Sequence, residues 1–421
     1  MKRILAMLLI LSMVLVFIPA CADEETSGLI ESSKGLTFKL NDDEKSYTLI
    51  GIGSCTEENI VIDSYAGYPV TEIAKSALMR ATNMKTLTIG DSVVVVGEVA
   101  FYGCENLSSV SIGKGVITIG KNAFENCTSL EQIVIPEGID EIPMRAFAGC
   151  TSLKSVSMSD DVTEIRGYAF ENCTALSTIT IPKNMKYIRD YSFKGCTGLV
   201  EVINHSSIEI VKNSDKNGGI AYYALNVHNG ESELIYKDDF IFYSVDKSNY
   251  LVKYTGDKAE VALPDDFEGE AYAIAPYAFS NNTKITAVKL GAKTSAIANN
   301  VFEGATALSK VELSSGVLVI GEAAFSSCVA LDKIDIPQSV QGIGVNAFAG
   351  CAALESVTVS ANLKIIGKNA FEGCGNLKSA VFEQTEGWKA GETDVPAEEL
   401  VDTAKAAECL TKTYVNVSWG R

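Results

Sequence analysis

Residues 130–150 read Leu-Glu-Gln-Ile-Val-Ile-Pro-Glu-Gly-Ile-Asp-Glu-Ile-Pro-Met-Arg-Ala-Phe-Ala-Gly-Cys, and this stretch decides the fold. Residues 131–135 are short and β-branched with alternating polarity, which predicts a strand. Pro136 ends that strand and helps to turn the chain. We expect Ile142 to point inward from an irregular stretch, and the Ala-Phe pair at 146–147 to form a short helical or 3-10 turn.

The same pattern recurs every 23 residues. Its phenylalanines form two series, and Leu78 takes the slot before the first: Phe101, Phe124, Phe147, Phe170 and Phe193, then Phe279, Phe302, Phe325, Phe348 and Phe371. An apolar residue stands five positions before each of these eleven residues, and the units of the first series carry a leucine six positions after. Self-similarity of this period indicates a solenoid of stacked units. We therefore expect an α/β repeat solenoid in which each unit adds one strand to a parallel sheet and the phenylalanines stack.

Composition limits the classes of protein that the chain can belong to. The 421 residues are 47% hydrophobic, which is enough for a large core, and the repeat overrides the division into several globular domains that this length would suggest. The net charge of −18 argues against nucleic acid and anionic lipid surfaces as partners, because both select basic patches. A membrane contact is expected only through a lipid anchor.

The N-terminus is typical of an export signal. Residues 1–22 begin with two basic residues, continue with an apolar run too short for a comfortable span, and end in Pro-Ala-Cys-Ala. Two processing routes remain open. Cleavage after Ala22 would release the protein, whereas lipidation of Cys21 would anchor it to a membrane. Both routes predict a secreted or cell-surface protein.

The repeat divides the remainder of the chain into five parts. We expect a β-hairpin cap and a lengthened first repeat at 28–77, a repeat block at 78–203, an irregular insert with a second hairpin at 204–275, a second block at 276–382, and a capping tail at 383–421. The hairpins should turn near residues 41–43 and 246–248. Phe242, Tyr250 and Gly256 echo Phe38, Tyr47 and Gly53, so the simplest account is a duplicated module of a hairpin and repeats.

Eight cysteines stand three residues after a phenylalanine: Cys104, Cys127, Cys150, Cys173, Cys196, Cys328, Cys351 and Cys374. Alanine takes two of the equivalent positions, which indicates a small buried site where cysteine behaves as a hydrophobe. A chain of disulfides is the alternative in an oxidising compartment. We favour free thiols because side chains in register point parallel and each block would leave one cysteine over.

Residues for catalysis, cofactor binding or metal binding are sparse. His205 and His228 are the only histidines, and no Cys-x-x-Cys pair exists. A Cys196–His205 pair can be imagined, but a repeat-phased Cys196 is most simply part of the core. The acidic clusters lack the ligand spacing of a calcium loop. We therefore predict no catalytic residue, no cofactor and no metal site.

Strand alternation identifies the residues that should point away from the core and could bind a partner. In the first block they are Thr86, Thr88, Ser109, Ser111, Gln132, Val134, Ser155, Ser157, Thr178 and Thr180. In the second block they are Ala287, Lys289, Lys310, Glu312, Lys333, Asp335, Ser356 and Thr358. The first set is almost uncharged and the second carries charge of both signs. Serine and threonine also suit any solvated sheet, so this composition is expected with or without a ligand.

The unit Cys-x-x-Leu-x-x-Ile-x-Ile-Pro-x-x-Ile-x-x-Ile-x-x-x-Ala-Phe resembles the BspA-like leucine-rich repeats of bacterial surfaces and some protists. The resemblance covers most of the chain after residue 22. It implies a right-handed, horseshoe-like stack that is secreted or held at the surface and binds a protein or glycan ligand of host or neighbouring cells in adhesion. It carries over no catalytic residue, and the usual asparagine ladder of leucine-rich repeats is absent. A structural envelope component that binds wall polymer or itself is the alternative, and a hydrolase using the insert is a third.

Overall fold

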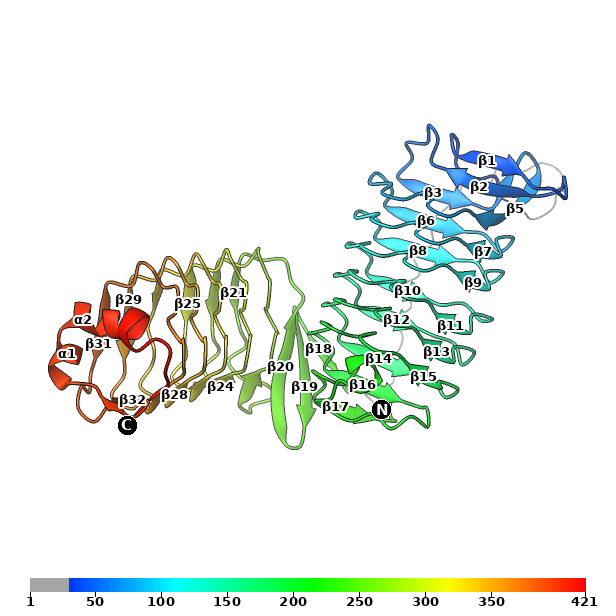
Figure 1. Cartoon of the computed structure of the whole chain (residues 1–421). Coiled ribbons are helices and arrows are strands. Elements are labelled where there is room, and N and C mark those ends of the chain that lie inside the picture. The colour runs from blue at the N-terminus through cyan, green and yellow to red at the C-terminus, as the bar shows by residue number, and fades with distance from the viewer. Residues whose placement is uncertain (1–29) are drawn as a thin grey trace.

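A computed structural model describes residues 30–421, so the predicted signal segment and Cys21 lie outside the described residues. Two stacks of rungs meet at an angle near β17 (Asn226–His228) and β20 (Ser248–Tyr254) (Figure 1). Among the helices of residues 30–421, none has the length and apolar character that a membrane crossing requires.

Each regular repeat contributes two strands to two parallel sheets, where the sequence predicted one strand and one sheet. In the first block the first strands are β3 (Asn59–Ile62), β6 (Thr86–Ile89), β8 (Ser109–Ile112), β10 (Gln132–Val134), β12 (Ser155–Ser157), β14 (Thr178–Ile181), β16 (Glu201–Asn204) and β17 (Asn226–His228). The second strands are β7 (Val95–Val96), β9 (Thr118–Ile119), β11 (Glu141–Ile142), β13 (Glu164–Ile165) and β15 (Tyr187–Ile188). The stretch containing Ile142 is therefore a strand, because each inward isoleucine pairs in register with its counterpart one rung away, as Ile142 does with Ile165.

The second block repeats this arrangement. Its first strands are β21 (Glu260–Ala262), β23 (Ala287–Lys289), β25 (Lys310–Glu312), β27 (Lys333–Ile334), β29 (Ser356–Val359) and β31 (Ser379–Phe382). Its second strands are β22 (Tyr272–Ile274), β24 (Thr294–Ile297), β26 (Val319–Ile320), β28 (Gly342–Ile343) and β30 (Ile365–Ile366). All neighbours among these strands of the second block are parallel and in register, apart from one irregularity between β22 and β24.

The phenylalanines form one continuous stack in each block. From Phe101 to Phe193 the ring centroids of successive residues lie 5.0, 5.5, 5.5 and 5.2 Å apart. From Phe279 to Phe371 the separations are 5.1, 5.1, 5.2 and 5.3 Å, and no successive pair of planes in either block is tilted by more than 25°. The predicted stacking is confirmed. The stack runs along the axis of the solenoid, and the apolar surface of each ring is thereby removed from water.

The segment around each Ala-Phe pair is a series of hydrogen-bonded turns and not the helical turn that we predicted. Asn122 and Asn126, two residues before and two after Phe124, have φ angles of 58° and 60°. A left-handed residue cannot continue a right-handed helix, so two of them in five residues exclude one. Within residues 30–421, helices occur only as a 3-10 helix at Asn217–Gly219, as α1 (Ala397–Val401) and α2 (Thr403–Glu408), and as a short π-helix at Cys409–Thr413. The predicted α/β character is therefore not found, and the fold is a β-solenoid.

The cysteines of the ladder are free thiols, as favoured from the sequence. Each Sγ donates to the backbone carbonyl of the residue 26 positions earlier, as Cys150 does to Phe124 O at 3.2 Å. Burial raises the pKa of Cys150 to about 12, so the thiol keeps its proton at neutral pH. The hydrogen bond explains why the small buried position usually holds cysteine and not alanine.

An antiparallel hairpin precedes each block. The first consists of β1 (Thr37–Leu40) and β2 (Tyr47–Gly51), followed by β4 (Ser64–Tyr65) and β5 (Tyr68–Ile73); the second consists of β19 (Phe240–Val245) and β20 (Ser248–Tyr254), and β18 (Ile235–Lys237) pairs with β19. Both hairpins carry a β-bulge directly before a phenylalanine. In the first hairpin this is Phe38, which pairs with Leu49, and in the second it is Phe242, which pairs with Leu251. This register places Thr48 level with Tyr250, so the sequence match of Tyr47 with Tyr250 was displaced by one residue.

The two hairpins differ in what covers their outer faces. In the second hairpin, Phe242 and Leu251 belong to the core of the second block, whereas Ile241, Tyr243 and Val252 point the other way and pack against Val200 of the first block. The bend between the blocks therefore has its own small apolar core.

Residues 204–238 are more regular than the sequence suggested. Strand β17 pairs with β16 in parallel, with Asn226 opposite Glu201, so the segment completes a further rung of 25 residues. Gly218 takes the place of the alanine of the Ala-Phe pair, because it accepts a hydrogen bond from Phe193 N as Ala146 does from Phe124 N. Gly219 then stands at the phenylalanine position, and Ile220 fills the core nearby. The period is hidden in the sequence because this rung has two extra residues and lacks the Ala-Phe pair.

The C-terminal segment covers the last rung of the second block. Strands β32 (Lys389–Ala390), β33 (Thr393–Asp394) and β34 (Trp419–Gly420) extend its second-strand sheet, with β34 antiparallel to β30. Trp388, Leu400 and Trp419 are buried against this end. The Asp402 side chain caps the N-terminus of α2 by accepting from the backbone N–H groups of Ala404 and Lys405.

Candidate binding surfaces

The first-strand sheet of the first block presents an uncovered, uncharged face. The predicted outward residues lie there as expected: Thr88, Ser109, Ser111, Gln132, Val134, Ser155, Ser157 and Thr180 are exposed, and Thr86 and Thr178 are half-buried. Val134 is 61% exposed, which is unusual for an apolar side chain in a sheet. Thr86 Oγ1 donates to Asn59 Oδ1 at 2.8 Å, so the hydroxyl row continues onto the preceding rung.

The corresponding face of the second block is charged, and its charges pair within a rung. Lys310 Nζ lies 2.7 Å from Glu312 Oε1, and Lys333 Nζ lies 2.9 Å from Asp335 Oδ2. The hydrogen bond raises the pKa of Lys310 and lowers that of Glu312. Lys289 is exposed, and Ser356 and Thr358 are half-buried. Such exposed pairs contribute little to stability, so this face differs from the first mainly in the ligands it could attract.

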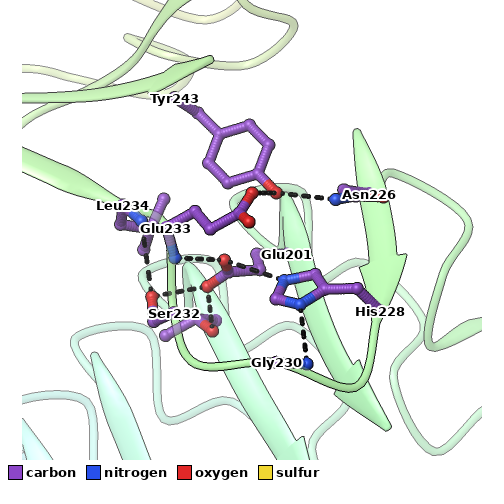
Figure 2. A network of polar contacts seen from close by, with 9 residues as sticks. Glu201, Asn226, His228, Gly230, Ser232, Glu233, Leu234 and Tyr243 are labelled. Carbon is purple, nitrogen blue, oxygen red and sulfur yellow. Dashed lines mark hydrogen bonds and ion pairs between the residues drawn. The ribbon is translucent and has the colours of Figure 1, made fainter. Parts of the chain in front are cut away.

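A buried carboxylate, that of Glu201, stands at the last rungs of the first block (Figure 2). Thr178 pairs with Glu201 in register, so the column of outward residues continues to this carboxylate. Glu201 is fully buried, and both of its oxygens are saturated. Oε2 accepts from Thr178 Oγ1 at 2.7 Å and from Ser232 Oγ at 2.6 Å, and Oε1 accepts from Glu233 N at 2.7 Å. A buried charge needs such donors to offset the loss of water. Sequence reasoning missed Glu201, although it is the one carboxylate in an otherwise uncharged column.

His228 completes this network, and the two hydrogen bonds of its ring determine its tautomer. Its Nδ1 accepts from Gly230 N at 3.1 Å, so the proton is on Nε2, which donates to Glu201 Oε1 at 3.2 Å. A catalytic triad requires a histidine nitrogen that accepts the proton of the nucleophile. Here Ser232 donates to the carboxylate instead, and the free histidine lone pair is already occupied. The arrangement orders the loop after β17 and is not that of a hydrolase.

The other predicted candidates are not brought together. Cys196 is buried and donates to Phe170 O at 3.0 Å, whereas His205 is exposed and lines an open basin with Asp160, Asp161 and Glu137. No group of histidine, cysteine and acidic residues that could hold a metal ion is found among residues 30–421.

Lys253 joins the two blocks. It lies on β20, is half-buried, and its Nζ contacts Ala175 O at 2.9 Å and Thr174 O at 3.4 Å. Burial lowers the pKa of Lys253 to about 8, because no carboxylate accompanies the amine. Beside it, Asn226 Nδ2 donates to Tyr243 Oη at 3.0 Å. Polar and apolar contacts therefore act together at the bend.

Comparison with known proteins identifies the repeat. A family model described as the BspA type leucine rich repeat region matches in six copies over residues 71–200 and 272–387. No curated protein is significantly similar to the chain.

Solved structures of bacterial leucine-rich repeat proteins are also similar. A leucine rich cell surface protein from Faecalibacterium prausnitzii is 23% identical over 86% of this chain and 96% of its own, with a TM-score of 0.39. A leucine rich repeat protein from T. pallidum is 28% identical over 41% of this chain and 81% of its own, with a TM-score of 0.40. The pneumococcal vaccine antigen PcpA is 18% identical over 93% and 98%, with a TM-score of 0.39. Because these TM-scores are below 0.5, the repeat match carries the comparison.

Proposed function

Because the chain belongs to the BspA-type leucine-rich repeat family, we propose that it is a non-enzymatic, secreted or cell-surface binding protein that mediates adhesion or protein–protein interaction with host or neighbouring cells. Repeat solenoids commonly use an extended sheet as a docking surface. The observation that carries the proposal is the exposed, uncharged face of β6, β8, β10, β12 and β14, which lacks any cover within the described chain.

The character of this face indicates how it would bind. Short hydroxyl side chains lose little conformational entropy on binding, and Gln132 adds an amide that can both donate and accept. Val134 offers apolar area near the middle of the face. A ligand that lies across several rungs would gain many weak contacts, which suits a protein or glycan chain better than a small molecule. The net charge of −18 disfavours nucleic acid.

Binding of the purified protein to a panel of immobilised matrix proteins and glycans tests the proposal. Ser157→Arg, on the proposed face, should abolish binding to any ligand found. Ser248→Arg places the same side chain at an equally exposed serine of the second hairpin and should leave binding intact. Equal effects of both substitutions, or the absence of any ligand on the panel, would overturn the proposal. Concentration-dependent self-association, followed by size exclusion, would instead favour a structural envelope component.

A further inference from the structure

One backbone position of the repeat is left-handed in every unit. The residue two positions before each phenylalanine, or before Leu78, has a φ angle between 49° and 62° in all eleven units. Asparagine tolerates this conformation best among residues with a side chain, and four units carry it: Asn122, Asn300, Asn346 and Asn369. Serine, valine and alanine take three others, at Ser76, Val99 and Ala323. In the second block Tyr277 takes one more, and its ring lies edge-on to that of Tyr223 at 5.1 Å.

Three consecutive units depart from this preference with large side chains. Arg145, Tyr168 and Tyr191 have φ angles of 56°, 62° and 60°. The turn itself gains nothing from a guanidinium or a phenol ring at this position. Large side chains held in a sparsely populated conformation are more often kept for a function than for the fold.

These three side chains form a continuous row, which we call the tyrosine strip. The guanidinium carbon of Arg145 lies 4.5 Å from the ring centroid of Tyr168. The rings of Tyr168 and Tyr191 stack at 5.3 Å with a tilt of 25°. Lys194 Nζ lies 5.6 Å from the ring centroid of Tyr191. Tyr191 is 52% exposed, so the strip reaches solvent while its neighbours hold it rigid.

Hydrogen-bond donors remain free on the strip, whereas the nearby acceptors are taken. Arg145 Nη1 contacts Glu171 Oε2 at 2.9 Å and Glu125 Oε1 at 3.6 Å, which occupies both carboxylates. Within residues 30–421, the hydroxyls of Tyr168 and Tyr191 and the Nε and Nη2 groups of Arg145 have no hydrogen-bond partner. The strip therefore offers donors and apolar ring edges at no net charge, since Arg145 and Lys194 balance the two glutamates.

This combination excludes several partners. A sugar ring or a nucleobase needs an open aromatic face, but Arg145 on the preceding rung and Tyr191 on the following rung cover both faces of Tyr168. A polyanion needs uncompensated cations. A ligand with many acceptors, few donors and apolar surface is required instead.

A proline-rich segment has these properties. Its carbonyl groups accept, it has no backbone N–H to leave unpaired, and its rings pack on aromatic edges. Two rung steps of about 4.8 Å each are close to one turn of polyproline II helix, about 9 Å. We propose that the tyrosine strip docks a proline-rich polypeptide segment in the polyproline II conformation. This deepens the proposed function by naming a partner class, and it places the contact away from the first-strand sheet.

Fluorescein-labelled decaproline, titrated into the purified full-length protein and followed by anisotropy, tests the inference. We expect saturable binding that 0.5 M salt leaves within about twofold, because no net charge is involved. A glycine-serine decapeptide and a glutamate decapeptide should bind at least tenfold more weakly. Failure of decaproline to bind at about 1 mM, or equal binding of either control peptide, would overturn the inference.

The matched variant combines Tyr168→Asn and Tyr191→Asn, which restores the residue that four other units carry at this position. It should bind decaproline at least tenfold more weakly while its melting temperature stays the same or rises. Tyr236→Asn, at a tyrosine 66% exposed on β18, should leave binding unchanged. Retained affinity in the double variant would refute the strip as the site. The sheet-face substitution Ser157→Arg should not affect decaproline binding, so the two proposals can fail separately.

Discussion

Replacing Phe147 by alanine tests the stacked core, because this ring lies in the middle of the first stack. Phe147 is fully buried, and its centroid lies 5.5 Å from both Phe124 and Phe170, with plane tilts of 5° and 9°. The neighbouring rings are fixed by backbone pairing one rung away on each side, so they cannot move into the gap. We expect the free energy of unfolding to fall by about 3–5 kcal/mol, the range for aromatic-to-alanine changes in closed cores.

Two probes can locate this loss within the chain. The only tryptophans, Trp388 and Trp419, lie at the end of the second block, so their fluorescence reports unfolding there. Far-UV circular dichroism reports both blocks. In urea, Phe147→Ala should shift the dichroism transition of the first block strongly and the fluorescence transition little, because units of a solenoid interact mainly with their neighbours.

Phe371→Ala is the matched control at the other end of the molecule. Phe371 has one stacked partner, Phe348 at 5.3 Å, and lies next to the tryptophans' rung. It should shift the fluorescence transition first. A loss below about 1 kcal/mol for Phe147→Ala would place the ring at a site that solvent or neighbours can fill, and would refute the reasoning.

Three further changes can be measured on the same protein. Cys150→Ala should cost only about 1 kcal/mol in chemical unfolding, and reductant should leave the melting temperature of the native protein unchanged. The pKa of Lys253 is lowered to about 8 when folded against about 10.4 unfolded, so the unfolded state binds more protons at this amine and its contribution to stability rises from pH 8 to 10.4. Buried thiols such as Cys150, whose pKa is raised, act in the opposite direction over the same window. The contribution of Lys253 is therefore the difference between the wild type and Lys253→Met in urea titrations at each pH, and this difference should grow from about pH 8 to 10.4 in favour of the wild type. Ile241→Thr with Tyr243→Lys should loosen the bend, seen as a larger maximum dimension in small-angle X-ray scattering; an unchanged dimension would count against the apolar joint.

The sequence predicted most of the solenoid because one signal repeats in every unit. A buried phenylalanine every 23 residues forces identical rings to stack, and the inward isoleucines follow from the same period. The second strand of each unit was not predicted, since two residues such as Glu141 and Ile142 are too few to show an alternating pattern. The prediction of a helical turn at the Ala-Phe pair was wrong, because the left-handed backbone of residues such as Asn122 leaves no signal in the hydrophobic periodicity of the sequence.

The candidate surfaces divide in the same way. The outward residues of the first-strand sheet follow from alternation alone, so their exposure could be predicted. Glu201 and His228 could not be placed together, because they come from neighbouring rungs separated by an atypical 25-residue unit. The tyrosine strip depends on a backbone φ angle and on contacts between rungs, neither of which periodicity reveals.

The two hairpins show how the same backbone unit serves two purposes. Their registers and bulges are equivalent, so Thr37 and Lys39 of the first hairpin correspond to Ile241 and Tyr243 of the second. In the first hairpin this outer face is polar, so it can remain exposed to solvent at the end of the stack. In the second hairpin the equivalent face is apolar, so it can be buried against the first block. Because the inner faces of both hairpins keep their phenylalanine and leucine, the outer face can change without loss of the fold. The chemistry of a single strand face thus determines whether a hairpin closes a solenoid or joins two of them.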